Sequence, residues 1–245
     1  MKISHTLWML ALCLRLAGGE RIIGGHEARP HSHPYMAFLY MFNKSTHCFS
    51  CGGFLIREDF VMTAAHCNAL NINVILGAHS IKKSESTQQI KQVQKQFIFP
   101  HYQNLQHDIK LLKLKSKAIL NNEVSLLPLP GDHDMAHPGT KCSVAGWGST
   151  SRTGNSITDK LQEMNVMVLP EEECKRQYPK KFTNNLMCAG DKMHEAFKGD
   201  SGGPLVCNGV ASGVVSFTSS NTELATVYTR VSAYKKWIEE VLNST

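Results

Sequence analysis

Hydrophobic and polar residues alternate in short runs along most of the chain, and Gly, Pro, Asn or Ser separates these runs. Such alternation is typical of half-buried β-strands. The predicted strands are Met36–Met41, Phe54–Ile56, Asn73–Leu76, Gln94–Phe99, Ile109–Leu114, Cys142–Ala145, Gln162–Leu169, Pro204–Cys207, Ala211–Val215 and Ala225–Thr229. Many short strands at this spacing predict an all-β protein, built as antiparallel barrels or as a sandwich.

The end of the chain has a helical period instead. The apolar positions that share one face of this predicted helix are Val231, Tyr234, Trp237, Ile238 and Leu242. Lysine and glutamate side chains occupy the opposite face, and Ser232 is expected to cap the helix N-terminus. The sequence therefore predicts an amphipathic C-terminal helix that packs on the β structure.

The stretch Asn121–Gly139 is rich in Pro and Asp and separates two halves of similar size. The 245 residues fit either two small domains or one large all-β body. We expect the chain to cross from one half to the other near residues 121–139, on the surface.

The N-terminus has the pattern of a secretory leader. Its apolar stretch Leu7–Ala17 follows a lysine and is too short to span a bilayer. Ala17 and Gly19 are small residues at the positions that precede a signal cleavage site. We therefore expect removal of residues 1–19, no later membrane anchor, and a protein that is secreted or stored in a secretory granule.

Composition adds two exclusions. A hydrophobic content of 42% with 19% charged residues is that of a globular protein and excludes global disorder. The net charge of +6 is too mild to indicate nucleic-acid recognition. Lysine-rich runs at Lys110–Lys117 and Lys175–Lys181 could bind a polyanion such as a proteoglycan, but alternation of Lys with Leu in the first run favours a solvated strand face.

The chain contains eight cysteines, and loss of Cys13 with the leader leaves an odd number. Exported proteins use cysteines mainly for disulfides. A zinc site from Cys48, Cys51 and Cys67 with His47 and His66 is the alternative, but a zinc ribbon requires a second closely spaced cysteine pair, which is absent. Disulfides are therefore favoured, and no metal is expected.

Two segments carry the glycosylation pattern Asn-x-Ser/Thr. Asn43-Lys44-Ser45 lies within the body of the chain, whereas Asn243-Ser244-Thr245 lies at its very end. We expect a glycan on Asn43.

The sequence Gly199–Pro204 places Ser201 between glycines. Glycines permit a tight turn that exposes the hydroxyl and aims backbone N–H groups at one point, as acyl transfer requires. A serine nucleophile also needs a base, and the base needs a third group to orient it. His66, within Thr63–Cys67, and Asp108, at the start of an apolar strand, are candidates that are uninformative when taken singly.

Taken together, His66, Asp108 and Ser201 in this order resemble the triad of the chymotrypsin-type serine proteases. The resemblance covers nearly everything after Arg21. The motifs that carry it are Ile22–Gly25, Cys51–Gly53, Thr63–Cys67, Val144–Gly148, Gly199–Pro204 and the terminal helix with Trp237. The segment Ile22–Met36 and the pair Phe197-Lys198 resemble the granzyme and mast-cell protease branch in particular.

This resemblance implies two six-stranded antiparallel β-barrels with the active site between them and a C-terminal α-helix. It implies a serine endopeptidase without a cofactor, with Ser201 as nucleophile, His66 as general base and then acid, and Asp108 as the buried orienting group. The N–H groups of Gly199 and Ser201 would form the oxyanion hole. The expected partners are peptide and protein substrates and serpin-type inhibitors, with no nucleic acid.

The resemblance also implies three disulfides: Cys51–Cys67, Cys142–Cys207 and Cys174–Cys188. Cys48 is left over, and we expect it to be a free thiol in a monomer, with a Cys48-linked dimer as the alternative. Phe197 stands where many relatives have a further cysteine, which is typical of the granzyme branch.

Activation is implied to require a cut between Arg21 and Ile22, because the new amino group can then pair with Asp200. Removal of the dipeptide Glu20-Arg21 by a dipeptidyl peptidase is favoured over a trypsin-like cut.

Substrate specificity is implied by five positions of the binding pocket. These are Glu195, Ala196, Ser216, Thr218 and Thr226. Two threonines narrow the pocket, which favours small or medium aliphatic residues before the cut bond; basic residues are the alternative if Glu195 points inward.

Two other function classes are less consistent with the sequence. A catalytically inactive relative that serves as a binding or antimicrobial protein would have a replaced triad residue, and none is replaced. An esterase of the α/β-hydrolase type needs the order Ser, Asp, His, which is the reverse of the order found here.

Overall fold

The first half of the chain forms a closed six-stranded antiparallel barrel, in the order β2-β3-β4-β7-β6-β5. In this computed structural model the described residues are 25–43, 47–131, 134, 136–149, 157–190, 200–218 and 225–244. The strands of the barrel are β2 (Met36–Asn43), β3 (His47–Arg57), β4 (Phe60–Thr63), β5 (Asn71–Leu76), β6 (Gln89–Ile98) and β7 (Lys110–Leu114). Their inward residues build one large core that includes Phe54 and Phe60.

The second half forms a seven-stranded antiparallel sheet in the order β1-β9-β8-β11-β12-β13-β10. Its strands are β1 (His26–Glu27), β8 (Lys141–Gly146), β9 (Gln162–Met167), β10 (Leu186–Ala189), β11 (Pro204–Cys207), β12 (Val210–Phe217) and β13 (Thr226–Arg230). A single bridge, Val168 to Ala189, joins β10 to the end of β9. The two barrel-like sheets of the predicted fold are therefore present: the first is a closed barrel, and the second is a half-barrel, to whose edge the short N-terminal strand β1 adds.

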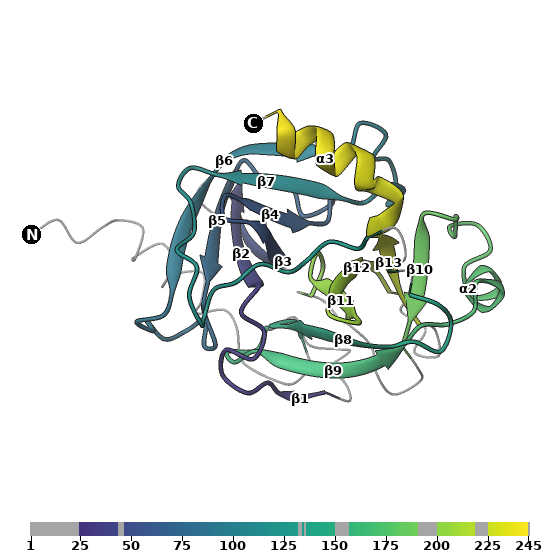
Figure 1. The fold of residues 1–245 in the computed structure, drawn as a ribbon, viewed down its shortest axis with the longest axis horizontal. Helices are drawn as coiled ribbons and strands as arrows, with labels where there is room; N and C mark the ends of the chain where they lie inside the picture. Colours follow the sequence, from purple (N-terminus) through teal and green to yellow (C-terminus); the bar gives the residue numbers. More distant parts are fainter. Residues whose placement is uncertain are drawn as a thin grey trace, which may run out of the picture.

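The two sheets lie side by side, and the connector expected near residues 121–139 runs between β7 and β8 (Figure 1). A third apolar cluster joins the halves, in which Phe38 of β2 meets Trp147, just after β8, edge to face at 5.7 Å. Together these contacts explain why two sheets from different halves of the chain are held next to each other, with loops of both meeting between them.

The C-terminal helix α3 (Lys235–Asn243) follows a 3₁₀ turn, η2 (Val231–Tyr234). Ile238 and Val241 of α3 pack into the core of the first barrel, so the end of the chain returns to the first half (Figure 1). The predicted cap by Ser232 is wrong, because α3 begins after Tyr234 and the residues before it form the 3₁₀ turn.

Four short elements, β1, β4, β10 and α2 (Glu171–Gln177), were not predicted from the sequence. β4 and β10 are buried at every position, so they lack the alternation that marks a half-buried strand. Helix α2 is a single short segment in which only Cys174 is buried. None of these elements has the pattern that the sequence analysis used to find the others.

The structure contains the disulfides Cys51–Cys67, Cys142–Cys207 and Cys174–Cys188, the pairing expected from the resemblance. Cys48 is disulfide-bonded as well. The prediction of a free Cys48 thiol is therefore wrong for the full chain.

The lysine-rich run of β7 is not a uniform solvated face. Lys110 is completely buried, and Lys113 pairs with Asp59 at 2.5 Å, whereas Lys115 and Lys117 are exposed. The expectation of a solvated strand face is thus wrong for Lys110, and no continuous basic stripe follows this strand.

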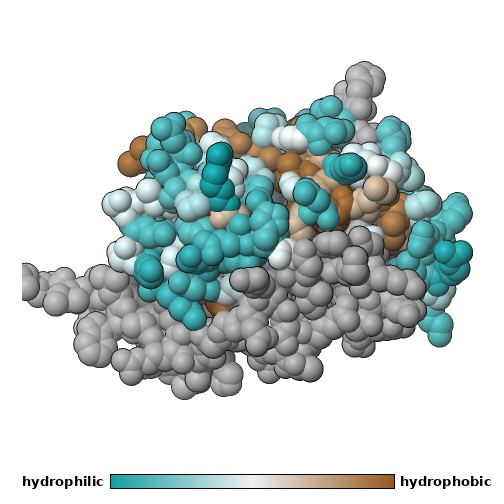
Figure 2. Space-filling model, turned by 90° about the horizontal axis from the view of Figure 1, so that it is seen from below, coloured by the Kyte–Doolittle hydropathy of each residue, from teal (hydrophilic) through white to brown (hydrophobic). Residues whose placement is uncertain are grey.

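The described surface seen from the side of β1 and β9 is mostly hydrophilic, with smaller groups of hydrophobic residues between (Figure 2). Exposed large hydrophobic residues are spread over several elements and include Leu70, Ile119 and Met167. Among the described residues, no helix has both the length and the apolar character needed to cross a membrane.

Candidate active site

His66 and Asp108 meet between the two halves of the molecule. His66 lies in the loop after β4, and Asp108 lies two residues before β7, the strand that pairs with β4. Asp108 Oδ2 lies 2.7 Å from His66 Nδ1, and Asp108 Oδ1 accepts a hydrogen bond from the His66 backbone N–H at 2.9 Å. Because an ionised carboxylate only accepts hydrogen bonds, this contact assigns the proton to Nδ1 and leaves Nε2 as an acceptor.

Asp108 is fully buried, whereas the His66 side chain is 25% exposed. Two hydroxyl groups from the second half complete the surroundings of the aspartate. Ser216 Oγ of β12 donates to Asp108 Oδ2 at 2.5 Å, and Thr229 Oγ1 of β13 donates to the Asp108 backbone carbonyl at 2.9 Å. The predicted proximity of Ser216 to the aspartate is thus present, and the Thr229 contact is an addition that the sequence did not indicate.

Ser201 lies on a tight turn just before β11, next to the histidine loop. The Gly52 backbone N–H of β3 donates to the Ser201 carbonyl at 2.8 Å, and Cys51 beside it is disulfide-bonded to Cys67, the neighbour of His66. The next residue, Gly202, has φ +82°, and a Cβ there would lie 2.1 Å from Thr63 Oγ1. Glycine is therefore required for this close approach of the two loops.

Asp200 is fully buried beneath the same turn, and the Gly148 backbone N–H donates to its Oδ1 at 2.8 Å. A Cβ on Gly148 would lie 2.4 Å from the Asp200 carboxyl group. Gly146 and Gly148 of the motif Val144–Gly148 thus leave the space that the Asp200 carboxylate occupies.

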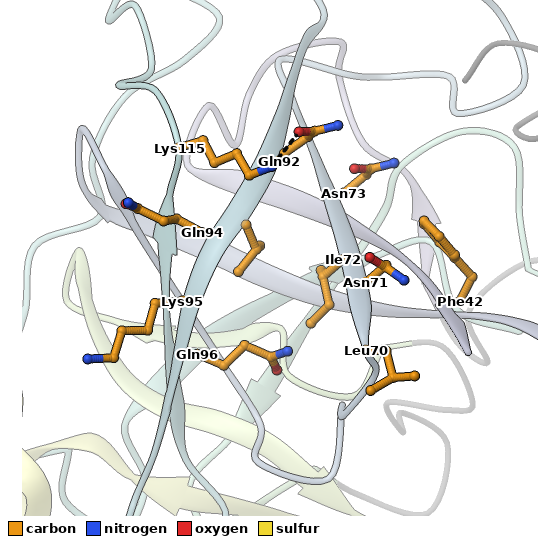
Figure 3. Close-up of a pocket in the computed structure, with 11 residues that line it drawn as sticks. Phe42, Leu70, Asn71, Ile72, Asn73, Gln92, Gln94, Lys95, Gln96 and Lys115 are labelled. Atoms are coloured by element: carbon orange, nitrogen blue, oxygen red, sulfur yellow. Dashed lines mark hydrogen bonds between the residues drawn. The ribbon is translucent and has the colours of Figure 1, made fainter. Parts of the chain in front are cut away.

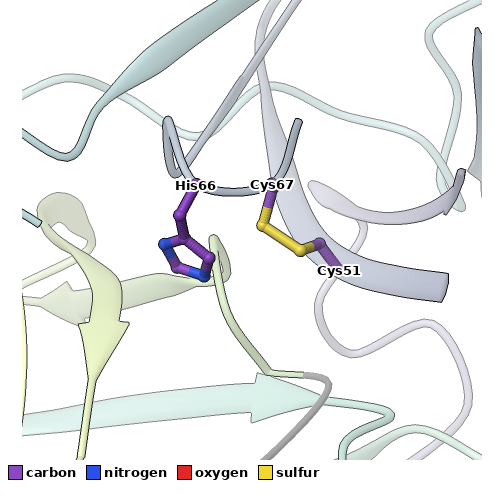
Figure 4. A group of neighbouring side chains, drawn as sticks. All are labelled: Cys51, His66 and Cys67. Atoms are coloured by element: carbon purple, nitrogen blue, oxygen red, sulfur yellow. A yellow bond between two sulfur atoms is a disulfide. The ribbon is translucent and has the colours of Figure 1, made fainter. Parts of the chain in front are cut away.

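Three side chains at this site have the spacing of metal ligands: Cys51, His66 and Cys67, whose potential ligand atoms lie within 4.8 Å of one another. Figure 4 shows the two sulfur atoms bonded to each other. Because a disulfide lacks the thiolates that bind zinc, these cysteines act as a covalent brace beside His66.

The predicted pocket residues are only partly described. Thr226 and Ser216 are buried, and the hydroxyl oxygen of Thr218 is buried as well. Glu195, Ala196, Gly199, Arg21 and Ile22 lie outside the described residues.

A separate pocket of about 320 Å³ opens on the outside of the first barrel, between β5 and β6 (Figure 3). Amide side chains line much of it, including Asn71, Asn73, Gln92 and Gln96. The triad candidates do not line this pocket, so it is distinct from the site at His66.

Comparison with known proteins agrees with this arrangement. The trypsin family matches residues 22–238 of the chain. A chymase from Canis lupus familiaris is 48% identical over 242 residues, covering 97% of this chain and 96% of the relative. Granzyme B from Rattus norvegicus is 45% identical over 247 residues, covering 99% of each.

A solved structure described as "Structure of GrC" aligns with a TM-score of 0.87 at 40% identity, covering 91% of this chain and 100% of that chain. The chain therefore belongs to the trypsin family, in the branch of chymases, mast cell proteases and granzymes, and is a chymotrypsin-type serine endopeptidase.

Proposed function

We propose that the chain hydrolyses peptide bonds through an acyl-enzyme intermediate, with Ser201 as nucleophile. The observation that supports this most directly is the hydrogen bond from His66 Nδ1 to the buried Asp108, beside the turn that carries Ser201. A serine hydroxyl becomes nucleophilic when an oriented base takes its proton. His66 is the base in the first half of the reaction and the acid that protonates the leaving amine.

Asp108 holds the His66 tautomer and stabilises the imidazolium that forms when the Ser201 proton is transferred. Hydrogen bonds from the His66 ring, the His66 backbone and Ser216 fix the buried carboxylate in place. The oxyanion of the tetrahedral intermediate is bound by the backbone N–H groups of Gly199 and Ser201. No metal or cofactor takes part in this proposed mechanism.

The protein is made as a zymogen in this proposal. Residues 1–19 are removed on export, and residues 20–21 are removed next, most readily by a dipeptidyl peptidase. The α-amino group of Ile22 then forms an ion pair with Asp200, whose carboxylate is fully buried and therefore stabilised by a cation. Residues 22–245 are the mature protease domain, which is secreted or stored in granules.

The partners in this proposal are peptide and protein substrates and serpin-type inhibitors. A glycan on Asn43 is compatible with its surroundings, because Asn43 ends strand β2 and is only partly buried. Its Oδ1 accepts a hydrogen bond from the Leu70 N–H at 2.8 Å, which holds the amide in one orientation.

We expect cleavage after small or medium aliphatic residues, because Thr218, whose hydroxyl oxygen is buried, and the buried Thr226 narrow the binding pocket. The test is cleavage-site profiling on a peptide library by the chain that begins at Ile22. Thr218→Gly widens the pocket, so we expect a gain of about tenfold or more for larger residues relative to alanine or valine.

Profiling of Glu195→Gln beside the wild type decides between the aliphatic and the basic preference. Strong cleavage after Arg or Lys that disappears in Glu195→Gln would show that Glu195 points into the pocket, against the aliphatic assignment. Cleavage after Phe or Tyr by the wild type would contradict a narrowed pocket.

A further inference from the structure

Lys110 is a fully buried lysine at the start of β7, two residues after Asp108. Its ammonium group donates hydrogen bonds to the backbone carbonyl of Cys67 and to Gln96 Oε1, the latter at 3.1 Å. Cys67 directly follows His66 in the chain. The buried charge is therefore bound to the peptide group beside the catalytic histidine.

Gln96 of β6 extends the same set of contacts. Its Nε2 donates to the Ala69 carbonyl at 2.8 Å, while its Oε1 accepts from Lys110. Figure 3 shows Gln96 in the pocket outside the first barrel, between Lys95 and Leu70. Gln96 of β6 and Lys110 of β7 thus donate hydrogen bonds to two backbone carbonyls of the loop from His66 to Ala69. Asp108 contacts His66 itself, through the ring and through the backbone N–H.

A lysine at this position is costly. Burial disfavours the charged form and lowers the pKa of Lys110 to about 8, against a partial opposing effect of Asp108. Lys110 is the register partner of Thr63 on the adjacent strand β4, and its ammonium contacts Gln96 of β6. An apolar side chain of similar length would remove this desolvation cost, but it would leave the Cys67 carbonyl and Gln96 Oε1 without the donor that Lys110 provides.

We propose that Lys110 is a positioning residue for the triad, whose ammonium fixes the Cys67 carbonyl and so keeps the His66 imidazole between Asp108 and Ser201. This inference rests on the proposed function of His66 as the general base. It gives the buried charge a role in catalysis, because displacement of a reacting group by about 1 Å can cost about 100-fold in rate.

The test compares Lys110→Met with the wild type, both beginning at Ile22 and both normalised by active-site titration. We expect kcat to fall about tenfold or more with KM within about twofold, because the substrate contacts are unchanged and the base is displaced. Relief of the buried charge and loss of its two hydrogen bonds act on the melting temperature in opposite directions, so the test rests on kcat. A purely structural lysine would leave the kcat of the titrated enzyme unchanged.

Lys113→Met is the matched control, because Lys113 lies on the same strand but pairs with Asp59, away from the histidine loop. It is expected to lower the melting temperature and leave kcat within about twofold of the wild type. Equal losses of kcat in Lys110→Met and Lys113→Met would overturn the proposal, as would a Lys110→Met enzyme with wild-type kcat.

A second measurement is independent of catalysis. In the Ser201→Ala background, the NMR resonance of the His66 Nδ1 proton reports its hydrogen bond to Asp108. We expect Lys110→Met to shift or broaden this resonance and Lys113→Met to leave it unchanged. An unchanged resonance in Lys110→Met would overturn the positioning role, whereas absence of Ser201-dependent activity in the wild type would overturn the proposed function.

The lowered pKa of Lys110 also predicts how stability depends on pH. The folded-state pKa of about 8 lies below the ordinary value of 10.5, so the unfolded chain binds the proton more tightly. Below about pH 8, burial of the charged Lys110 ammonium lowers the free energy of unfolding by its full amount. This cost disappears as the pH rises toward 10.5, where the unfolded chain also loses the proton. Between pH 7 and about pH 10, the melting temperature of the wild type is therefore expected to rise relative to that of Lys110→Met. A constant difference between the two melting temperatures would contradict a buried charge at Lys110.

Discussion

Replacing Ser201 by alanine in the chain that begins at Ile22 is expected to lower kcat by about 10⁴-fold or more. The substitution removes the nucleophile, and the hydroxyl that it deletes belongs to a partly exposed turn rather than to a core. The melting temperature is therefore expected to stay within a few degrees of the wild type. Steady-state hydrolysis of a peptide found by profiling, together with thermal unfolding, measures both quantities.

His66→Ala is expected to be about as damaging as Ser201→Ala, and the double variant no worse than either, because the two residues act as a unit. His137→Ala is the matched control, since His137 is an exposed histidine of the connector. Near-wild-type peptidase activity in Ser201→Ala would show that another residue is the nucleophile.

Exposure of the Ile22 amino group is expected to produce the second large effect. A chain that begins at Glu20 should have less than about 1% of the activity of one that begins at Ile22, because the oxyanion loop lacks the ion pair to Asp200 that orders it. This expected difference in activity comes from one buried ion pair, between the Ile22 amino group and Asp200, and breaking a buried ion pair is costly. Activity of the two purified chains on the same peptide measures it.

Treatment of the Glu20 chain with a dipeptidyl peptidase is expected to restore activity, and Asp200→Asn in the Ile22 chain is expected to abolish most of it. The carboxylate of Asp200 fits tightly between Gly146 and Gly148, so the nearly isosteric asparagine keeps the packing and removes the charge. Full activity of the Glu20 chain without any cleavage would contradict both routes of activation.

Most strands of the fold were predictable because alternation of apolar and polar residues records which face of a strand is buried. β11 was found with its observed bounds, Pro204–Cys207, because turn residues flank it on both sides. β4 and β10 were not predicted, because their residues are buried on both faces and so do not alternate between apolar and polar. Whether the strands close into a barrel depends on pairings between distant segments, which periodicity does not record.

The residues of the candidate site were predictable only through their joint resemblance to a family, because a single His, Asp or Ser has many structural uses. Residues that hold the triad candidates and Asp200 in place were harder to predict from the sequence. Lys110 stands in a lysine-rich run that is typical of a solvated face, and only the three-dimensional structure shows that its side chain is buried behind the histidine loop. Gly148 and Thr229 have no chemical signature of their own and act through the space or the hydrogen bond that they provide.

Labelling with diisopropyl fluorophosphate tests the central claim most directly, because this reagent phosphorylates a serine that an oriented base has activated. The chain that begins at Ile22 is treated, digested and analysed by mass spectrometry beside His66→Ala and His137→Ala. The account predicts one adduct, on Ser201, in the wild type and in His137→Ala, and its loss in His66→Ala. An adduct on another serine, or equal labelling of Ser201 without His66, would contradict the assignment of His66 and Ser201 as base and nucleophile.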